Sequence, residues 1–285
     1  MVNIPDIKAT IDNIKEIPTL PTIVGDLLTM VMREDCNARN LAEKISLDQS
    51  LTLKVLKVAN SAYYGFQRRI HSVQDAIVIL GFNEIKGLVL TISVLDMFGG
   101  FSSQYFNRNN FWKHSLAVAT TAEILSEKST LRFPEAFVAG LLHDVGKVIL
   151  DHYFNDIWGE IVMLMQSESL HSYEAELKVF EKNITHATVG YWVVEKWNLP
   201  SHLAESIRYH HSLNKMGEDT LLTAIVYASN VLVYQWEPNL MFEPTTPELN
   251  HDVAKLLNIT DDNSPGLFEE LNKRFELRKE VLNIL

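Results

Sequence analysis

Cysteine is almost absent from this chain of 285 residues, since Cys36 is the single one. A lone cysteine cannot form a disulfide within the chain, which excludes a small disulfide-stabilised domain and fits a reducing compartment. No apolar run approaches the roughly 20 residues that a membrane-spanning helix needs. The start of the chain also lacks the basic and apolar stretches of a signal peptide. We therefore expect a cytoplasmic protein that does not cross a membrane.

Positive charge is scarce as well. The chain has 25 Lys and Arg residues against 36 Asp and Glu residues, which gives a formal net charge of −11. Such a balance repels nucleic-acid backbones and anionic membrane surfaces unless a local basic patch overrides it. The pair Arg68–Arg69 is too short to form such a patch. We therefore expect binding to neither nucleic acid nor membranes.

Strand patterns are missing, because no stretch combines sustained apolar–polar alternation with hairpin turns. Apolar residues recur instead at three- and four-residue steps, as over 20–33, which is typical of an amphipathic helix. Asp48 has the side chain and the position of a helix N-cap. Similar spacing predicts helices over 83–98, 108–128, 134–154, 156–167, 172–182, 185–197, 201–211, 219–236, 247–257 and 265–283. The sequence predicts an all-α fold, a multi-helix bundle.

Two short interruptions divide the helical pattern. The segment 99–107 carries two glycines and two serines, and the segment 237–250 is rich in proline and asparagine. Neither resembles a long flexible linker. We expect an amino-terminal helical subdomain over 1–104, a helical subdomain with the candidate site over 105–236, and carboxy-terminal helices packed on the core over 237–285.

Five histidines and one aspartate give the clearest indication of chemistry: His114, His143, Asp144, His186, His210 and His211. Imidazole and carboxylate groups are suitable ligands for zinc, iron and manganese ions. A carboxylate such as that of Asp144 can bridge two ions or orient a bound water, whose pKa the metal lowers. These residues therefore predict a metal pocket.

A purely structural role competes with this interpretation. A lone histidine on a helix is more often an ordinary core or surface residue than a ligand, and we interpret five in this way: His71, His152, His171, His202 and His251. Asp144 differs, because it follows an apolar segment and a buried carboxylate needs a cation or several donors beside it. A hydrogen bond from His143 would also meet that need. Residue chemistry alone leaves both interpretations open.

A resemblance favours the metal pocket. The segments FWKHSL, LLHDVGK, HATVG and YHH resemble, in this order, the ligand pattern of the HD phosphohydrolase superfamily. The order is most similar to that of HD-GYP cyclic-dinucleotide phosphodiesterases and their HDOD relatives. The amino-terminal segments IPTLPTIVGDLLTMV, ISLDQSLTLKVLKVANSAYYG and IHSVQDAIVILGFNEIKGLVLTIS resemble HDOD helices. The glycine-tyrosine-proline signature of HD-GYP proteins is missing, since SLNKMGEDT follows His211.

The resemblance also assigns roles to residues outside the histidine set. Catalytic HD enzymes end their ligand set with an aspartate on a late helix, and the matching stretch IVYASNVLV places Asn230 there. An amide oxygen is a weaker ligand than a carboxylate, so the resemblance implies a weakened site, unless Asn230 is an ordinary helix residue. In those enzymes the lysine equivalent to Lys147 holds substrate phosphate, and the resemblance implies the same role here. The alternative is that Lys147 only forms a salt bridge. Gly146, inside a helical pattern, predicts close packing or close approach of a ligand.

Taken as a resemblance to HDOD proteins, the pattern implies a bacterial signal-transduction protein that acts through protein partners or a bound ligand. Its cofactor would be divalent metal, with iron favoured over manganese and zinc. The alternative is a metal-dependent phosphohydrolase acting on a nucleotide or cyclic dinucleotide, with Asp144 and Lys147 as catalytic residues. A nucleotide sensor without turnover would use the same pocket. Which of His210 and His211 faces that pocket is left open, because helix neighbours point about 100° apart.

Overall fold

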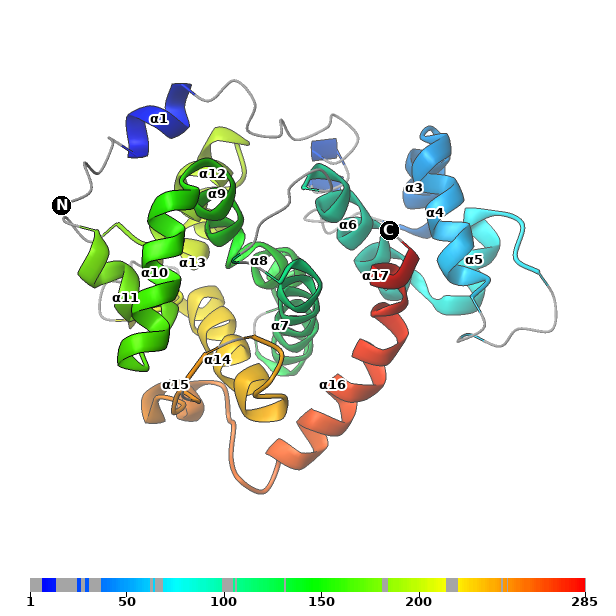
Figure 1. Cartoon of the computed structure of the whole chain (residues 1–285). Coiled ribbons are helices and arrows are strands. Elements are labelled where there is room, and N and C mark those ends of the chain that lie inside the picture. Colours follow the sequence, from blue (N-terminus) through cyan, green and yellow to red (C-terminus); the bar gives the residue numbers. More distant parts are fainter. Residues whose placement is uncertain are drawn as a thin grey trace. The chain divides into compact units, whose positions relative to one another are not determined.

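All regular secondary structure in the part of the chain that the computed structural model describes is helical (Figure 1). The described residues are 7–13, 25–26, 29–30, 37–61, 64, 69–98, 105, 107–130, 132–180, 184–213, 220–241, 243–244 and 246–284. No strand occurs among them, and the predicted all-α fold is confirmed. None of the helices in these ranges combines the length and hydropathy that crossing a bilayer requires. Most of the predicted helix 20–33 lies outside the described residues.

Two compact units make up the chain. The first, which we call the pocket unit, comprises Met1–Ile17 and Phe101–Phe268, and the second comprises Pro18–Gly100 and Glu269–Leu285. Helix α16 (Ser264–Arg278) runs from the first unit into the second. The three-part division drawn from the sequence stays a prediction.

The second unit contains α3 (Ala38–Ser46), α4 (Gln49–Ala59), α5 (Val73–Leu80), α6 (Phe82–Met97) and α17 (Glu280–Ile284). The predicted N-cap is confirmed, because Asp48 Oδ1 accepts a hydrogen bond from the backbone N–H of Leu51 at 3.0 Å. Arg278 of α16 is 2% exposed and donates to both carboxylate oxygens of Glu84, at 2.9 and 3.1 Å. This ion pair fixes the end of α16 to α6.

The pocket unit contains ten further helices within the described ranges: α1 (Ile7–Asn13), α7 (Arg108–Lys128), α8 (Ala136–Leu142), α9 (Val145–Tyr153), α10 (Asn155–Glu168), α11 (Ser172–Val179), α12 (His186–Lys196), α13 (Ser201–Tyr209), α14 (Thr220–Trp236) and α15 (His251–Leu256). Helix α7 packs against α8 and α14, while α12 packs against α9 and α13 (Figure 1). The helices that carry the candidate site therefore pack directly on one another.

Small residues let these helices approach closely. Ala117, Ala119 and Ala122 of α7 are fully buried. A Cβ added to Gly140 of α8 would lie 2.7 Å from the Cα of Ala119, so only glycine fits at this crossing. The tight contact holds α7, and with it His114, against the end of α8.

The predicted continuous helix over 134–154 is wrong. It is divided into α8 and α9, and Asp144 between them has φ −101° and ψ 8°, outside regular helical geometry. The interruption has a structural consequence, because two neighbours within one regular helix would point about 100° apart. At a helix junction, His143 and Asp144 can both face the same pocket.

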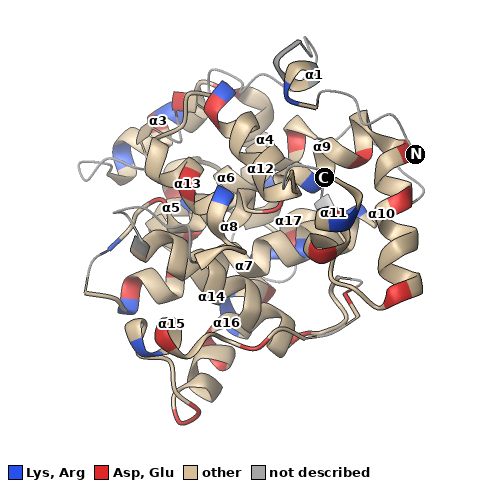
Figure 2. Ribbon diagram, turned by 90° about the vertical axis from the view of Figure 1, so that its left-hand side faces the viewer, with Lys and Arg blue, Asp and Glu red and all other residues tan. Residues whose placement is uncertain are grey.

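Lysine and arginine residues of the described chain are spread over several helices and interleaved with acidic residues (Figure 2). The absence of nucleic-acid binding stays a prediction.

Candidate metal centre

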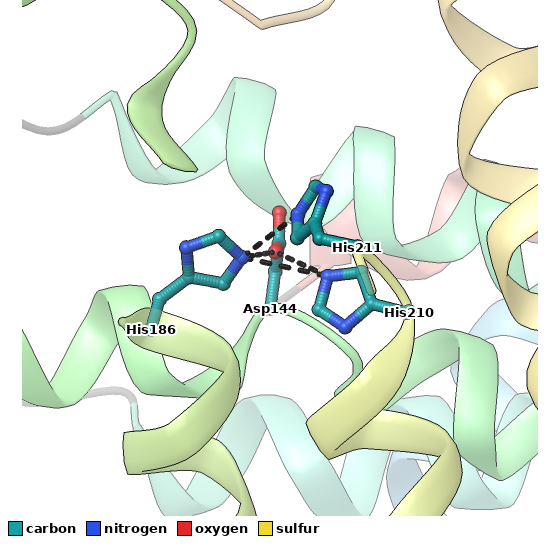
Figure 3. A group of neighbouring side chains, drawn as sticks. All are labelled: Asp144, His186, His210 and His211. Atoms are coloured by element: carbon teal, nitrogen blue, oxygen red, sulfur yellow. Dashed lines mark hydrogen bonds and ion pairs between the residues drawn. The ribbon is translucent and has the colours of Figure 1, made fainter. Parts of the chain in front are cut away.

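The predicted histidines and Asp144 come together in two overlapping groups. The ligand atoms of the first, which we call the His186 group, lie within 4.8 Å of one another, and its members are Asp144, His186, His210 and His211 (Figure 3). The second, the His114 group, meets the same limit and consists of His114, His143 and Asp144. Both groups lie in the pocket unit and share one carboxylate.

The two oxygens of Asp144 face different groups. Oδ1 lies 3.1 Å from Nε2 of His186 and 3.6 Å from Nε2 of His210. Oδ2 lies 3.4 Å from Nε2 of His143 and 2.8 Å from Nζ of Lys147. This arrangement is suited to a carboxylate that bridges two neighbouring cations.

Helix ends place the adjacent histidines. His210 is the C-cap of α13 and His211 follows it, beyond the regular helix. Their Nε2 atoms lie 3.4 Å and 3.1 Å, respectively, from Nε2 of His186. Both rings therefore face the pocket, which answers the question that the sequence left open.

Hydrogen bonds set the direction of the ring lone pairs. Nδ1 of His143 donates to the backbone oxygen of Gly140 at 2.8 Å, and Nδ1 of His210 donates to that of Ile207 at 2.6 Å. A neutral imidazole that donates from Nδ1 has an unprotonated Nε2. Both Nε2 atoms point toward Asp144 with the lone pair that a metal ligand would use.

His186 is oriented by a carboxylate. Its Nδ1 lies 2.8 Å from both oxygens of Glu176, and its backbone N–H donates to Oε2 of Glu176, also at 2.8 Å. Both side chains are fully buried. A histidine held through Nδ1 by a carboxylate directs Nε2 at the metal, which is the usual arrangement around protein metal sites.

Several buried polar atoms lack hydrogen bonds. Nε2 of His143, Nδ1 of His114 and Oδ1 of Asp144 have no hydrogen-bond partner among the described residues. Buried groups of this kind are rare in folded proteins, where nearly all find a partner. Nitrogen and oxygen lone pairs that lie this close together without hydrogen bonds fit a divalent metal ion. The chemistry of the residues therefore agrees with the predicted metal.

Burial and neighbouring charges shift the ionisation of the site. Burial lowers the pKa of His114 to about 3 and that of His210 to about 4, so both rings are neutral at neutral pH. Burial alone would raise the pKa of Asp144, but the surrounding His143, Lys147 and His186 outweigh it and hold the pKa well below its ordinary value. Asp144 is thus a carboxylate throughout the neutral range.

Two predicted site residues have partners within the protein. Lys147 is 2% exposed and lies between carboxylates, with Nζ 2.8 Å from Oδ2 of Asp144 and 3.7 Å from Oε1 of Glu243. Asn230 is 5% exposed, and its Oδ1 lies 3.0 Å from Nε2 of His114 as acceptor. Metal ligation by Asn230 and phosphate binding by Lys147 stay predictions.

Sequence reasoning missed other residues at this site. Glu176 and Glu243 carry no recognisable motif, and each comes into contact with the site only through the folding of the chain. Tyr173 stacks on His211 with ring centroids 4.6 Å apart. His171, an ordinary histidine by its sequence context, lies with Nδ1 3.1 Å from Oε2 of Glu243.

Comparison with known proteins identifies the same family as the sequence motifs. The HDOD domain family matches residues 17–213 of the chain. Two curated bacterial relatives, from Treponema pallidum and Bacillus subtilis, are uncharacterised. The chain spans about two fifths of the length of these relatives, 42% and 40%.

Solved structures confirm the fold. An HDOD domain protein of unknown function from Geobacter sulfurreducens is 26% identical, with a TM-score of 0.79 over 98% of this chain and 96% of that one. A proposed signal transduction protein from Marinobacter aquaeolei is 21% identical, with a TM-score of 0.78 over 94% and 60% of the two chains. A proposed phosphohydrolase from Shewanella amazonensis is 22% identical, with a TM-score of 0.72 over 97% and 98%.

Proposed function

Because this chain belongs to the HDOD domain family, we propose that it is a bacterial signal-transduction protein whose pocket unit binds divalent metal and a small anionic ligand. A protein partner responds to the occupied pocket, and the protein works in the cytoplasm. The observation that carries the proposal is the sharing of Asp144 between two groups of convergent ligand atoms. Its two oxygens face different histidines, which supports one ion on each side of the carboxylate.

The donor set supports a transition metal. The His186 group offers three imidazoles and the His114 group two, and imidazole suits iron, zinc and other transition metals better than magnesium or calcium. We propose iron, with manganese and zinc as alternatives. When bound, such ions polarise phosphoryl oxygens and lower the pKa of bound water.

The chain's own residues favour binding over turnover. Asn230 presents an amide oxygen to His114 where catalytic relatives of the superfamily are expected to carry a carboxylate ligand. Lys147 supplies a buried positive charge beside Asp144, which attracts a negatively charged ligand. Glu176 fixes the orientation of His186. These features support a ligand-binding regulator.

The metal content of the purified chain tests this proposal. Elemental mass spectrometry on protein prepared without a metal-affinity tag is expected to find about two equivalents of metal per chain. His143→Ala removes a ligand from the His114 group alone and is expected to retain about one equivalent. Asp144→Asn weakens both groups and is expected to lose nearly all metal.

The control is His251→Ala, because His251 is 90% exposed and distant from both groups in sequence. It is expected to keep the metal content of the unaltered chain, and circular dichroism confirms that each variant is folded. No metal in the unaltered chain, even after anaerobic loading, would contradict the proposal.

A second function, metal-dependent hydrolysis of a nucleotide or cyclic dinucleotide, is favoured by Lys147. Its ammonium group lies 2.8 Å from Asp144 and would steady phosphate oxygens beside the shared carboxylate.

Asn230→Asp tests this second function, because it would restore a carboxylate next to His114. If the protein is a weakened enzyme, the rate of hydrolysis of bis(p-nitrophenyl) phosphate is expected to rise about tenfold or more. The control Asn40→Asp changes an exposed side chain by the same charge. An unchanged rate of hydrolysis in Asn230→Asp would contradict the enzymatic function, and the regulatory function would be the one that remains.

A further inference from the structure

Glu243 lies outside any helix, between α14 and α15, yet its side chain is only 3% exposed. Its Oε1 accepts a hydrogen bond from Oγ of Ser172 at 2.7 Å, and its Oε2 accepts one from the backbone N–H of Ser172 at 2.9 Å. Nδ1 of His171 lies 3.1 Å from Oε2, and Nζ of Lys147 lies 3.7 Å from Oε1. Four nitrogen or hydroxyl groups thus surround one carboxylate.

Burying this carboxylate is costly without those donors. Burial alone would raise the pKa of Glu243, but the hydrogen bonds from His171 and Ser172 and the charge of Lys147 outweigh it and hold the pKa below its ordinary value. A glutamate on a connecting segment could remain hydrated at the surface at no such cost. Its burial therefore indicates that the surrounding groups attract an anion.

The donors are those that proteins use for phosphate. The N–H and hydroxyl of Ser172 lie at the first turn of α11, an eight-residue helix, where backbone N–H groups favour anions. Lys147 is independent of that helix, since it belongs to α9, and its ammonium group is 2% exposed. Ammonium and imidazole groups form strong charge-assisted hydrogen bonds to phosphate oxygens.

Glu243 also lines two cavities of the pocket unit. One has a volume of about 330 Å³ and is lined in part by Lys147, Tyr105 and Trp158. The other has a volume of about 180 Å³ and is lined in part by His210, His211 and Asn230. Ser172 and Glu243 line both. The Glu243 side chain therefore lies at the boundary of the two cavities, and the smaller one reaches the candidate metal centre.

We propose that His171, Ser172 and Lys147 form a binding site for a ligand phosphate group, and that the carboxylate of Glu243 occupies it as an internal competitor. The inference rests on the proposed function, because it names the ligand class and the regulation of the same pocket. A phosphate ester bound there displaces Glu243, and its organic part enters the larger cavity beside Tyr105. The displaced connection between α14 and α15 is the change that a partner recognises.

Isothermal titration of the full, metal-loaded chain with inorganic phosphate tests the proposal. Glu243→Gln is expected to lower the dissociation constant about tenfold, because the competing carboxylate is gone. Glu248→Gln removes the same charge from an exposed position of the same connection and is expected to leave affinity unchanged. Adding Ser172→Ala to Glu243→Gln is expected to abolish the gain. Equal affinity in Glu243→Gln and the unaltered chain would overturn the proposal.

Glu243→Asp distinguishes competition from simple charge repulsion. It keeps the charge but shortens the side chain, which withdraws the carboxylate from Ser172, so an intermediate gain in phosphate affinity is expected. An aspartate variant that matches the unaltered chain would show that charge alone is responsible and would overturn the proposal. On the unaltered chain, saturating phosphate is expected to increase amide hydrogen exchange around Glu243. Unchanged exchange would count against displacement even if the variants fold poorly.

Metal content, measured on the same samples, separates this inference from the proposed function. If metal binds as expected but Glu243→Gln shows no gain in phosphate affinity, the internal competitor is refuted and the proposed metal site is still supported. The reverse result, a gain in phosphate affinity in a chain that takes up no metal, supports the phosphate site and overturns the metal-dependent function.

Discussion

Gly146→Ala is expected to destabilise the pocket unit by more than about 4 kcal/mol, enough to unfold it or displace the candidate centre. An alanine Cβ would lie 1.9 Å from the backbone oxygen of His186 and 2.7 Å from the backbone nitrogen of Gly190. Both clashes are with the backbone of α12, which cannot rotate away as a side chain could. Helices α9 and α12 would have to separate, and His186 would move with α12. Urea denaturation followed by circular dichroism measures the loss.

Gly266→Ala is the matched control. Gly266 lies within α16, and an added Cβ meets no atom within 4 Å. Alanine is the better helix former by about 1 kcal/mol, so a neutral or slightly stabilising effect is expected. If Gly146→Ala had the stability of Gly266→Ala, the close approach of α9 to α12 would be refuted.

The sequence predicts close packing or close approach of a ligand at Gly146, and the contact with α12 shows the close packing. A glycine within a predicted helix is informative because it is unfavourable in a helix interior and needs a reason in the folded state. Helix positions were also predictable where the apolar pattern was long: the expected helix 108–128 coincides with α7, Arg108–Lys128. Local patterns therefore predicted most of the helices, while residue chemistry together with the family resemblance indicated most of the residues that meet at the centre.

Features that depend on contacts between distant segments were not predictable. The junction between α8 and α9 interrupts an apolar pattern that continues through it, so periodicity alone indicated one helix. Glu176 and Glu243 resemble ordinary surface glutamates in the sequence, and only the packing of α11 on the site buries them. Periodicity also says nothing of which unit a helix joins, as the course of α16 illustrates.

Glu176→Gln is expected to weaken metal binding by the His186 group about 10- to 100-fold. The carboxylate of Glu176 accepts hydrogen bonds from both the backbone N–H and Nδ1 of His186, at 2.8 Å. In glutamine an amide NH2 group replaces one of the two oxygens that lie 2.8 Å from Nδ1, so a donor then faces the Nδ1 proton. The neutral ring then moves its proton to Nε2, which faces Asp144 at 3.1 Å, and the ligand lone pair is lost. Competition with a chelator measures the metal affinity.

Glu168→Gln is the control for this substitution, because Glu168 makes an exposed ion pair with Lys178 and touches no ligand. It is expected to bind metal as the unaltered chain does. Nitrogen NMR of the imidazoles separates orientation from folding: in folded Glu176→Gln the proton of His186 is expected on Nε2. A folded variant with Nδ1 still protonated and full metal affinity would show that Glu176 does not position this ring. A proton on Nε2 together with weakened metal binding would instead show that the loss of affinity arises at Nε2 of His186. The other residues of the group keep their own hydrogen-bond partners, as His210 does with the backbone oxygen of Ile207.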